Sequence, residues 1–592
     1  MAPTSLRYLK VFGLGAVATL VMVACGGGGG TSSNLAADQT LKFPILGDFG
    51  TLDPAVADAE TDSEIQQNMF NGLVKFDNNL NVVPDIATSM PTVSSDNLTY
   101  TFKLRQDVTF SNGDKVTSAD VLYSWNRAAA YQGSYATNLA AIDGYDKVSA
   151  NTVNGGAALE ALLEKNDPSV TLSGLKAPDP YTVQAKLSSP AGWFLSAIAL
   201  AGTTGQLVDK NVVKTDPDNW WNKPATAIGT GAFKMTGYVP KQSVDFQAVD
   251  NWWGTPKPTL KKVHIDILGN AHSAITAYEQ GSYDIYGYGG YSNAPVDDIL
   301  RIQGTANEKA QLLIHPKVRT TWVQFNLVHD SKRTAKGPFQ CDYVGGYAVC
   351  SGTPTADKAK NLRMAFALAV DKAKLATVVC HDIICTAATG GLITKGLVGY
   401  AGDNSDPLAK FDAAQAKQLL DANGGAAAVA GLSYTYDPNN PLNTSVAQFL
   451  QDQWQTNLGV HVDLTPVDHS AFIKGYLSGK YALARNGWQA DYNHPQDWVD
   501  NLWGKIVGCP DSGCGSGYDT KAYDDAVAAA DALPLSQAIP KYQAIMKMLE
   551  DDAIYIPLYY SQGAFLIKSY VKGAGTNNFF DYYWDQIQIL QH

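Results

Sequence analysis

The stretch SVAQFLQDQWQTNLGVHVDLTPV, residues 445–467, places an amphipathic helix directly before a strand. Residues 445–459 carry apolar side chains at helical spacing and end in a glycine, a common helix stop. Residues 460–467 then alternate apolar and polar side chains, as a strand with one buried face does. A helix that leads straight into a strand indicates α/β layering.

Other segments of the chain show the same mixture of periods. Ser118 is the expected N-cap of one helix, and Gly281 is the expected stop of another. Strands are expected at 100–110, 244–249 and 261–268, and helices at 119–130, 272–281 and 359–379. The fold class that follows is α/β with several sheets.

Length and composition exclude some classes of protein. A chain of 592 residues suggests roughly two to four domains, and 45% apolar content can build a large core. The net charge is −12 and there is no long basic run, which argues against nucleic acid as a partner. The 30 Tyr and 12 Trp fit either a large core or a binding surface.

The amino terminus reads as an export signal. Arg7 and Lys10 precede an apolar run at 11–24 that is too short for an ordinary membrane span. The run ends at Cys25 and a glycine-rich segment, and it resembles a bacterial lipoprotein signal. That resemblance implies that residues 1–24 are removed, that the Cys25 thiol carries lipid, and that residues 25–40 are a flexible tether. The alternative is a plain secretory signal with a chance cysteine.

The six cysteines other than Cys25 fall into three close pairs. Many connectivities are possible, but local pairing is the simplest and suits an oxidising compartment. The expected disulfides are Cys341–Cys350, Cys380–Cys385 and Cys509–Cys514. Metal binding is the alternative, because His381 lies between two of the cysteines, although no CxxC occurs.

Seven segments, in this order, resemble extracellular solute-binding proteins of the peptide/nickel family, which serve ABC importers. They are GTLDPAVADAE (50–60), NGLVKFDNNLNVVPDIATS (71–89), YTFKLRQDVTFSNGDKVTSADVLYSWNR (100–127), GTGAFKMTGYVPKQSVDFQAVDNWWG (229–254), EQGSYDI (279–285), RMAFALAVDKAKL (363–375) and IYIPLYY (554–560). The resemblance spans about residues 42–590. It implies an α/β, two-lobed, periplasmic-binding-protein-like fold whose lobes close on ligand by hinge motion.

The resemblance also implies a division of the chain. Lobe one is expected at 41–70, 207–326 and 561–592, with an extra subdomain at 71–206 and lobe two at 327–560. The hinge crossovers are expected near 320–328 and 558–563. Residues 147–176 and the Cys341–Cys350 segment look like insertions.

The stretch ARNGWQADYNHP, residues 484–495, places a carboxylate among aromatic side chains. Chemistry alone leaves a turn, a catalytic acid, a metal ligand or an anchor for a cation. The resemblance maps the family's ammonium-binding carboxylate onto Asp491, with Arg485 and the backbone of Gly487 near the same end of the ligand. Trp488 would pack on the ligand or on the core.

Two further regions complete the expected site on the opposite side of the cleft. Residues 56–60, with Asp58, Ala59 and Glu60, align with a ligand-lining strand of the family. Tyr135 matches a family tyrosine. Such a site reads peptides mainly through their backbone, so broad selectivity is expected.

The remaining expectations concern partners and alternatives. The ligand is expected to be a peptide, with an oligosaccharide or a metal chelate as alternatives and a non-transport sensory role also open. The resemblance implies an ABC permease as the partner. Because the chain has no P-loop, any ATP hydrolysis is expected in a separate ATPase subunit. The protein is expected to be a monomer without cofactor, metal or nucleic acid, outside the cytoplasm and anchored to the membrane through Cys25.

Enzyme activity is the alternative of a different class. Glu550, Asp551 and Asp552 offer acid and base groups, but they lie at a helix end where solvation is expected. No hydrolase, zinc-protease or P-loop motif occurs. His494 is expected at the surface or behind the site, and His461 and His469 on a strand and the following loop, rather than as metal ligands.

Overall fold

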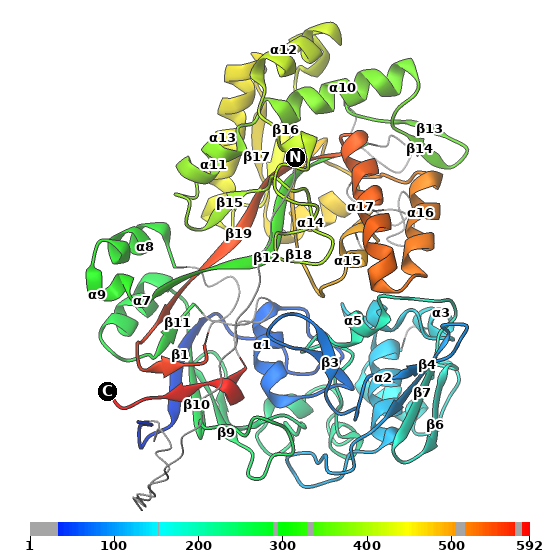
Figure 1. Cartoon of the computed structure of the whole chain (residues 1–592), viewed down its shortest axis with the longest axis vertical. Helices are drawn as coiled ribbons and strands as arrows, with labels where there is room; N and C mark the ends of the chain where they lie inside the picture. The colour runs from blue at the N-terminus through cyan, green and yellow to red at the C-terminus, as the bar shows by residue number, and fades with distance from the viewer. Residues whose placement is uncertain are drawn as a thin grey trace, which may run out of the picture.

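The computed structural model describes residues 34–151, 153–287, 294–327, 337–500, 502–503, 516–574 and 583–592. Figure 1 shows two lobes, one above the other, joined by two long strands. Cys25, Cys509 and Cys514 lie outside the described residues. Within those ranges, no helix has both the length and the apolar composition that a membrane span requires.

The lower lobe is built on a four-stranded sheet in the order β1-β10-β9-β8. Along β10, Val263, Ile265 and Ile267 are buried in strict alternation, as expected for 261–268. The strands of this sheet are β1 (Thr40–Leu46), β8 (Phe233–Val239), β9 (Ser243–Ala248) and β10 (Lys262–Leu268). Its helices are α1 (Glu60–Met69), α7 (Ala271–Glu279), α8 (Val296–Gln303) and α9 (Ala306–Lys309).

A second sheet lies beside the lower lobe, at the lower right of Figure 1, in the order β4-β5-β7-β6. Its strands are β4 (Thr92–Val93), β5 (Thr99–Lys103), β6 (Leu175–Asp179) and β7 (Thr182–Lys186), with the hairpin β2 (Val74–Phe76) and β3 (Val82–Pro84) nearby. Its helices are α2 (Ser118–Tyr131), α3 (Tyr145–Ser149), α4 (Gly156–Leu163), α5 (Phe194–Ile198) and α6 (Lys210–Val213).

Two local predictions in this region are wrong in detail. The cap of α2 is Thr117, whose side chain forms a capping box with Asp120, so Ser118 is already the first helical residue. The strand expected over 100–110 ends at Lys103, and Leu104 forms an isolated bridge with Ala87 instead of continuing the ladder with β7.

The upper lobe surrounds a larger sheet in the order β11-β19-β12-β18-β16-β17, with β15 also paired to β19. The strands are β11 (Ile285–Tyr286), β12 (Leu312–Phe325), β15 (Cys385–Ala387), β16 (Ser433–Tyr436), β17 (Asp463–Pro466), β18 (Leu483–Gln489) and β19 (Tyr555–Ile567). The helices are α10 (Pro354–Leu368), α11 (Lys372–Val378), α12 (Ala413–Ala422), α13 (Pro441–Leu458), α14 (His469–Leu477), α15 (Gln496–Val499), α16 (Lys521–Asp531) and α17 (Leu535–Asp551).

The stretch at 445–467 folds as a helix followed by a strand. α13 ends at Leu458, and Gly459 takes the left-handed conformation with φ of 70° that favours glycine at this position. β17 then pairs in parallel with β16, the strand before α13, so the three elements form a β-α-β unit. The helix and strand are confirmed, although the strand is shorter than expected.

The single helix expected over 359–379 is wrong. α10 ends at Leu368 and α11 begins at Lys372, and the side chain of Asp371 accepts a hydrogen bond from the Lys374 amide. Asp371 therefore starts a new helix. Because the residues on both sides of it are typical of helices, the sequence alone suggests one continuous helix.

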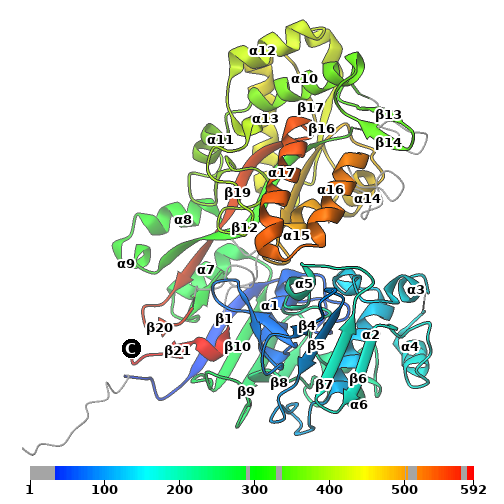
Figure 2. The same cartoon turned by 45° about the vertical axis from the view of Figure 1, so that its right-hand side comes forward.

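Two strands run through both lobes. β12 and β19 pair in antiparallel fashion, with Pro316 opposite Gln562 and Thr320 opposite Tyr560. The register shifts between these two pairs, so the ladder is irregular around Lys317. Figures 1 and 2 both show this pair of strands crossing from the lower lobe to the upper one.

The structure contains two of the expected local disulfides. Cys341–Cys350 closes the hairpin of β13 (Asp342–Val344) and β14 (Tyr347–Val349), and Cys380–Cys385 closes the turn between α11 and β15. The strands β20 (Val571–Lys572) and β21 (Gln588–Ile589) form a separate antiparallel pair, and Leu590 after it bridges to Leu35 at the start of the described chain.

Candidate ligand-binding site

The stretch at 484–495 forms β18 and the loop after it. β18 lies between β12 and β16, and Gln489 at its end is opposite Arg319 of β12. Because β12 crosses between the lobes at this point, the loop that follows β18 faces the lower half of the molecule. Asp491 therefore lies where the upper lobe meets the lower one.

Asp491 contacts a side chain from the opposite side of the cleft. The Tyr135 hydroxyl donates a hydrogen bond to the Asp491 carboxylate, and Tyr135 directly precedes a short helical turn, Ala136–Leu139, beside α2. The Thr204 hydroxyl donates to the Tyr135 carbonyl oxygen at 3.1 Å and helps to fix this turn. The structure thus brings together two residues that are 356 positions apart (491 minus 135) and that the sequence assigned to one site.

The environment of Asp491 disfavours its charged form. Burial raises the pKa of Asp491 well above its ordinary value, and the nearby charge of Asp497 raises it further. The hydrogen bond from Tyr135 acts in the opposite direction, because it favours the carboxylate. A cation placed beside Asp491 would favour the carboxylate still more.

Trp488 is partly exposed and packs against the core of the upper lobe. Its indole Nε1 donates to Asp497 Oδ2 at 3.2 Å. Asp497 is fully buried in α15, so this bond fixes the orientation of a half-exposed aromatic ring. Asp497 was not identified from the sequence as a site residue, although it lies only six residues after Asp491.

Arg485 and Gly487 lie on β18 itself. Arg485 is half-buried near Tyr434 of β16, and its charge opposes the rise that burial causes in the pKa of Tyr434. Gly487 lies opposite Thr321 in β12. A Cβ added at Gly487 would lie 3.1 Å from the Thr320 carbonyl oxygen, so a side chain here would press on β12.

The expected ligand-lining strand at 56–60 is wrong as a strand. Asp53 accepts hydrogen bonds from the amides of Val56 and Ala57 through its carbonyl oxygen, which folds the run into a turn. Ala59 then caps α1 with extended backbone, and Glu60 is the first helical residue.

The three predicted residues in this run have different surroundings. Asp58 is exposed and Ala59 is half-buried. Glu60 forms an ion pair with Lys317 of β12 at 3.5 Å, with both side chains about 5% exposed. Glu60 therefore meets the crossing strands at the irregular point of their ladder.

A buried ion-pair network that sequence reasoning missed holds this run in place. Arg127 of α2 donates to both carboxylate oxygens of Asp53, at 2.8 and 2.6 Å, and lies 3.4 Å from Glu160. The Trp220 indole also donates to Asp53, at 3.1 Å. All four side chains are buried, so the network ties α2 firmly to the turn at 53–57. In the sequence, the one hint of this network is Arg127, which lies in the helix expected at 119–130 beside its apolar face.

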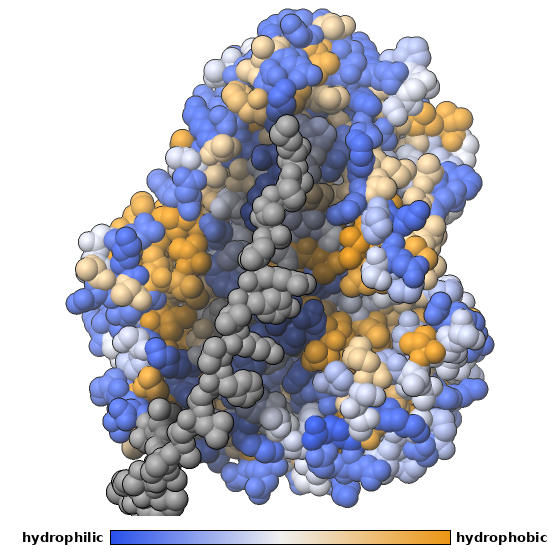
Figure 3. All heavy atoms as spheres, viewed as in Figure 1, coloured by the Kyte–Doolittle hydropathy of each residue, from blue (hydrophilic) through white to orange (hydrophobic). Residues whose placement is uncertain are grey.

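The two halves also touch beside the candidate site. The Asn493 side-chain amide donates to the Leu80 carbonyl oxygen at 3.2 Å, and the Gly192 amide donates to the Asp531 carbonyl oxygen at 2.7 Å. Figure 2 shows α15 of the upper lobe directly above α5. In Figure 3, hydrophobic residues gather above and below the junction between the lobes, on the right-hand side of the view.

A cavity of about 260 Å³ lies in the upper lobe next to the crossing strands. It is bounded by Pro316, by Tyr560 to Gln562 and by the loop that carries Thr394 and Lys395. The Val398 amide of the same loop donates to Asn493 at 2.8 Å. The loop therefore links this cavity to the segment that carries Asp491.

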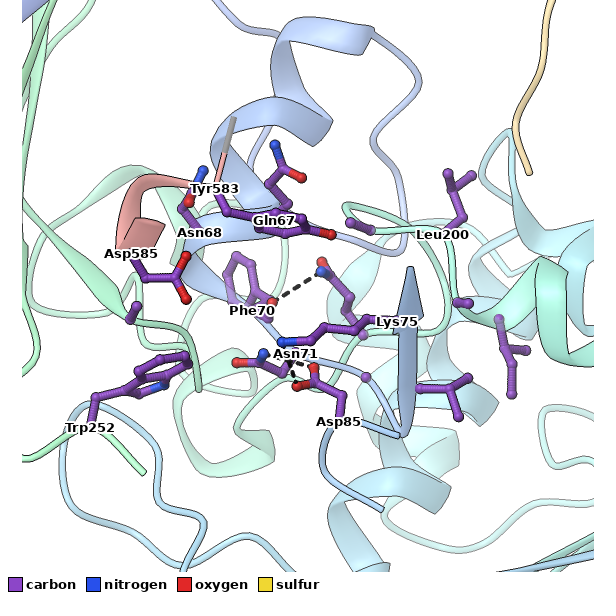
Figure 4. A pocket seen from close by; sticks show the side chains of 17 residues that line it. Gln67, Asn68, Phe70, Asn71, Lys75, Asp85, Leu200, Trp252, Tyr583 and Asp585 are labelled. Atoms are coloured by element: carbon purple, nitrogen blue, oxygen red, sulfur yellow. Dashed lines mark hydrogen bonds and ion pairs between the residues drawn. The ribbon is translucent and has the colours of Figure 1, made fainter. Parts of the chain in front are cut away.

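A smaller cavity, of about 30 Å³, lies between the end of α1, the β2–β3 hairpin and Trp252, away from the predicted ligand residues (Figure 4). Lys75 forms an ion pair with Asp85 at 3.2 Å inside it, and Asn71 donates to the same carboxylate at 2.8 Å. The Gln206 side chain donates to the Phe70 carbonyl oxygen at 3.1 Å. These contacts join the β2–β3 hairpin, the end of α1 and the segment around Gln206 within the lower half of the molecule.

The structure also shows the surroundings of the residues that were considered from the sequence for catalysis or metal binding. His494 is buried, so of the two places expected for it the one behind the site agrees with the structure and the surface does not. Burial lowers its pKa to about 3, and its Nδ1 accepts a hydrogen bond from the Gln496 amide. Glu550 is half-buried, and its pKa is raised to about 8. Burial is the largest cause, and the nearby charge of Asp406 adds to it. In the described ranges, no three His, Cys, Asp or Glu side chains are grouped as metal ligands.

Comparison with known proteins agrees with this architecture. The family described as bacterial extracellular solute-binding proteins, family 5 middle, matches residues 81–506. The periplasmic murein peptide-binding protein MppA of Escherichia coli K12 is 26% identical over 562 residues, which is 92% of each chain. The probable deoxycholate-binding periplasmic protein YgiS of the same strain is 25% identical over 575 residues, 94% of this chain and 95% of YgiS.

Solved structures share the fold. MppA in its unliganded open form superimposes with a TM-score of 0.73 at 24% identity, covering 95% of this chain and 99% of that chain. The two-lobed α/β architecture and the family match over most of the chain lead to one conclusion. This chain belongs to the bacterial extracellular solute-binding proteins of family 5, a family of binding receptors rather than enzymes.

Proposed function

We propose that the protein captures peptides by their amino terminus in the cleft between its lobes. The observation that carries this proposal is the contact between Asp491 and Tyr135, which joins the two walls of the cleft at the predicted ammonium anchor. A peptide α-amino group is mostly charged at neutral pH, and burying that cation requires a well-placed anion. Asp491 supplies the anion, with Tyr135 orienting it.

The surroundings of Asp491 favour a peptide over an oligosaccharide. A sugar site would be expected to tie Asp491 to Arg485 beside a stacked Trp488. Instead, Asp491 is in contact with Tyr135 and Asp497, and the Trp488 indole is held by Asp497. The relative MppA is a murein peptide-binding protein, which agrees with this choice of ligand class.

We further propose how the chain is divided and where it works. Lobe one comprises 41–70, 207–326 and 561–592, the subdomain 71–206, and lobe two 327–560. Cys25 carries the lipid that anchors the monomeric receptor outside the cytoplasm, and an ABC permease with a separate ATPase receives the peptide. Support comes from the family match and from the leader sequence.

Isothermal titration calorimetry tests the ligand class. Trialanine should bind, and N-acetyl-trialanine should bind poorly, because acetylation removes the cation that Asp491 pairs with. Maltotriose and deoxycholate serve as the competing classes. Binding of either competitor in preference to trialanine, or equal binding of the acetylated peptide, would refute amino-terminal peptide capture.

A further inference from the structure

A second carboxylate stands directly behind the proposed anchor. Asp497 is the second residue of α15 and is fully buried. Its Oδ2 accepts a hydrogen bond from the Asp491 amide at 3.0 Å and another from the Trp488 indole at 3.2 Å. One oxygen atom therefore fixes the main chain of the anchor and the ring of its aromatic neighbour.

The same carboxylate acts on the charge of the anchor. Two of the described side chains act on the Asp491 carboxyl: the charge of Asp497 from α15 raises its pKa, and the hydrogen bond from Tyr135 in the opposite half lowers it. Two carboxylates this close disfavour being charged together, and Asp497 adds to the effect of burial on the pKa of Asp491. Geometry and charge thus point to the same residue.

We propose that Asp497 is a positioning residue that holds Asp491 and Trp488 for the ligand's amino terminus and couples ligand binding to release of a proton from Asp491. This inference rests on the proposed function, because it requires a ligand ammonium beside Asp491. The proton leaves the Asp491 carboxyl for the solvent as the ammonium arrives. Charge in the site is balanced by the ligand's cation.

The sign of the coupling follows from linkage. Ligand binding favours ionised Asp491, so the affinity falls as the pH drops below the pKa of Asp491 in the free protein. In Asp497→Asn the amide oxygen can still accept from both N–H groups, but the charge is gone. The pKa of Asp491 then falls, and the loss of affinity moves to lower pH.

The test is calorimetric titration with trialanine and N-acetyl-trialanine from pH 5 to 9. Wild type should lose affinity on the acid side, and Asp497→Asn should shift that loss by about one pH unit downward. The control is Asp525→Asn, which removes an exposed carboxylate that pairs with Lys521 in the same lobe and should behave as wild type. Repeating the titration in two buffers of different ionisation enthalpy counts the protons released.

The outcomes separate the two proposals. If trialanine keeps its advantage over the acetylated peptide but Asp497→Asn has the wild-type pH profile, the role of Asp497 is refuted and the peptide site stands. Equal binding of both peptides refutes both. If Asp497→Asn does not fold, the proton count on wild type decides, because binding without proton release at any pH in the range refutes the coupling.

Discussion

The backbone amide of Gly192 donates a hydrogen bond to the carbonyl oxygen of Asp531 at 2.7 Å, and these residues belong to opposite halves of the molecule. Gly192 precedes α5, and Asp531 is the last residue of α16. A Cβ added at Gly192 would overlap the carbonyl oxygen of Leu533 in the turn after α16. The contact between the two halves at this point thus depends on a backbone-to-backbone approach that has no room for a side chain.

Gly192→Ala should hinder closure of the lobes. We expect trialanine affinity to fall about tenfold, equivalent to ~1.4 kcal/mol, because ligand binding must then work against the clash. Small-angle scattering with saturating peptide should give a larger radius of gyration than wild type. Gly269→Ala is the control, since nothing lies within 4 Å of its added Cβ. An unchanged affinity and radius in Gly192→Ala would show that the contact is incidental.

Asp491→Asn should weaken trialanine binding by roughly 1.5–3 kcal/mol, the scale of a hydrogen bond to a charged group. The carboxylate is lost, but size and shape are retained. Calorimetry at pH 8 measures the change in binding free energy, and the same variant should bind N-acetyl-trialanine no worse than wild type does. Loss of both peptides to the same extent would argue for a structural role instead.

Arg127→Met should lower the free energy of unfolding by about 3–5 kcal/mol, because it leaves Asp53 and Glu160 buried without their cation. Arg105→Met is the matched comparison. Arg105 pairs with Asp107 at 2.8 Å, but both side chains are at least one-third exposed, so the expected loss is below about 1 kcal/mol. Urea denaturation of both variants measures the difference, and equal losses would contradict the assignment of a buried network.

Asp500 and Asp531 should make the protein less stable at higher pH. Their carboxyls hydrogen-bond to each other, and burial raises the pKa of Asp500 to about 6 and that of Asp531 well above its ordinary value. The folded state therefore holds protons that the unfolded chain has released, and stability falls as the pH rises from about 4 through 6 and beyond.

Asp500→Asn removes one member of this pair. The fall in free energy of unfolding between pH 5 and pH 8 should shrink by about 2 kcal/mol relative to wild type. Other carboxyls such as Asp406 and Asp585, with pKa raised to about 6 by burial, act in the same direction, so only the difference between the proteins is diagnostic. Parallel pH profiles would contradict a shared proton.

Cys25→Ser should release the protein from the membrane fraction of the producing cell. The thiol is the only attachment point that the lipoprotein-like leader provides for lipid. Fractionation followed by immunoblotting measures the distribution, with Cys380→Ser as a control for loss of a cysteine in general. Continued sedimentation of Cys25→Ser with membranes would refute the anchor.

Local sequence patterns predicted much of the fold because periodicity reports which face of an element is buried. The alternation at 261–268 and the helix-to-strand order at 445–467 both appear in the structure. Boundaries were less certain, since Thr117 and Ser118 are both good caps and only the backbone conformation decides between them.

The site was predicted less completely than the fold. The family resemblance led to Asp491 and Tyr135, which the structure brings together. Asp53 in the turn at 53–57 is held by Arg127 and Trp220, and His494 lies against Tyr542. These partners are far along the chain, so no spacing rule reports them. Asp497 is close to Asp491 in the sequence, but no sequence pattern identifies it as the hydrogen-bond acceptor for both the Asp491 amide and the Trp488 indole.

The pairing of Arg127 with Asp53 limits how such receptors can be recombined. A chimaera that took residues 71–206 from one relative would bring a new partner for Asp53 and Trp220 without bringing those two residues themselves. Any mismatch would bury an unpaired charge in the core. The segment that carries Asp53, the segment that carries Trp220 and residues 71–206 must therefore be exchanged together in a working chimaera.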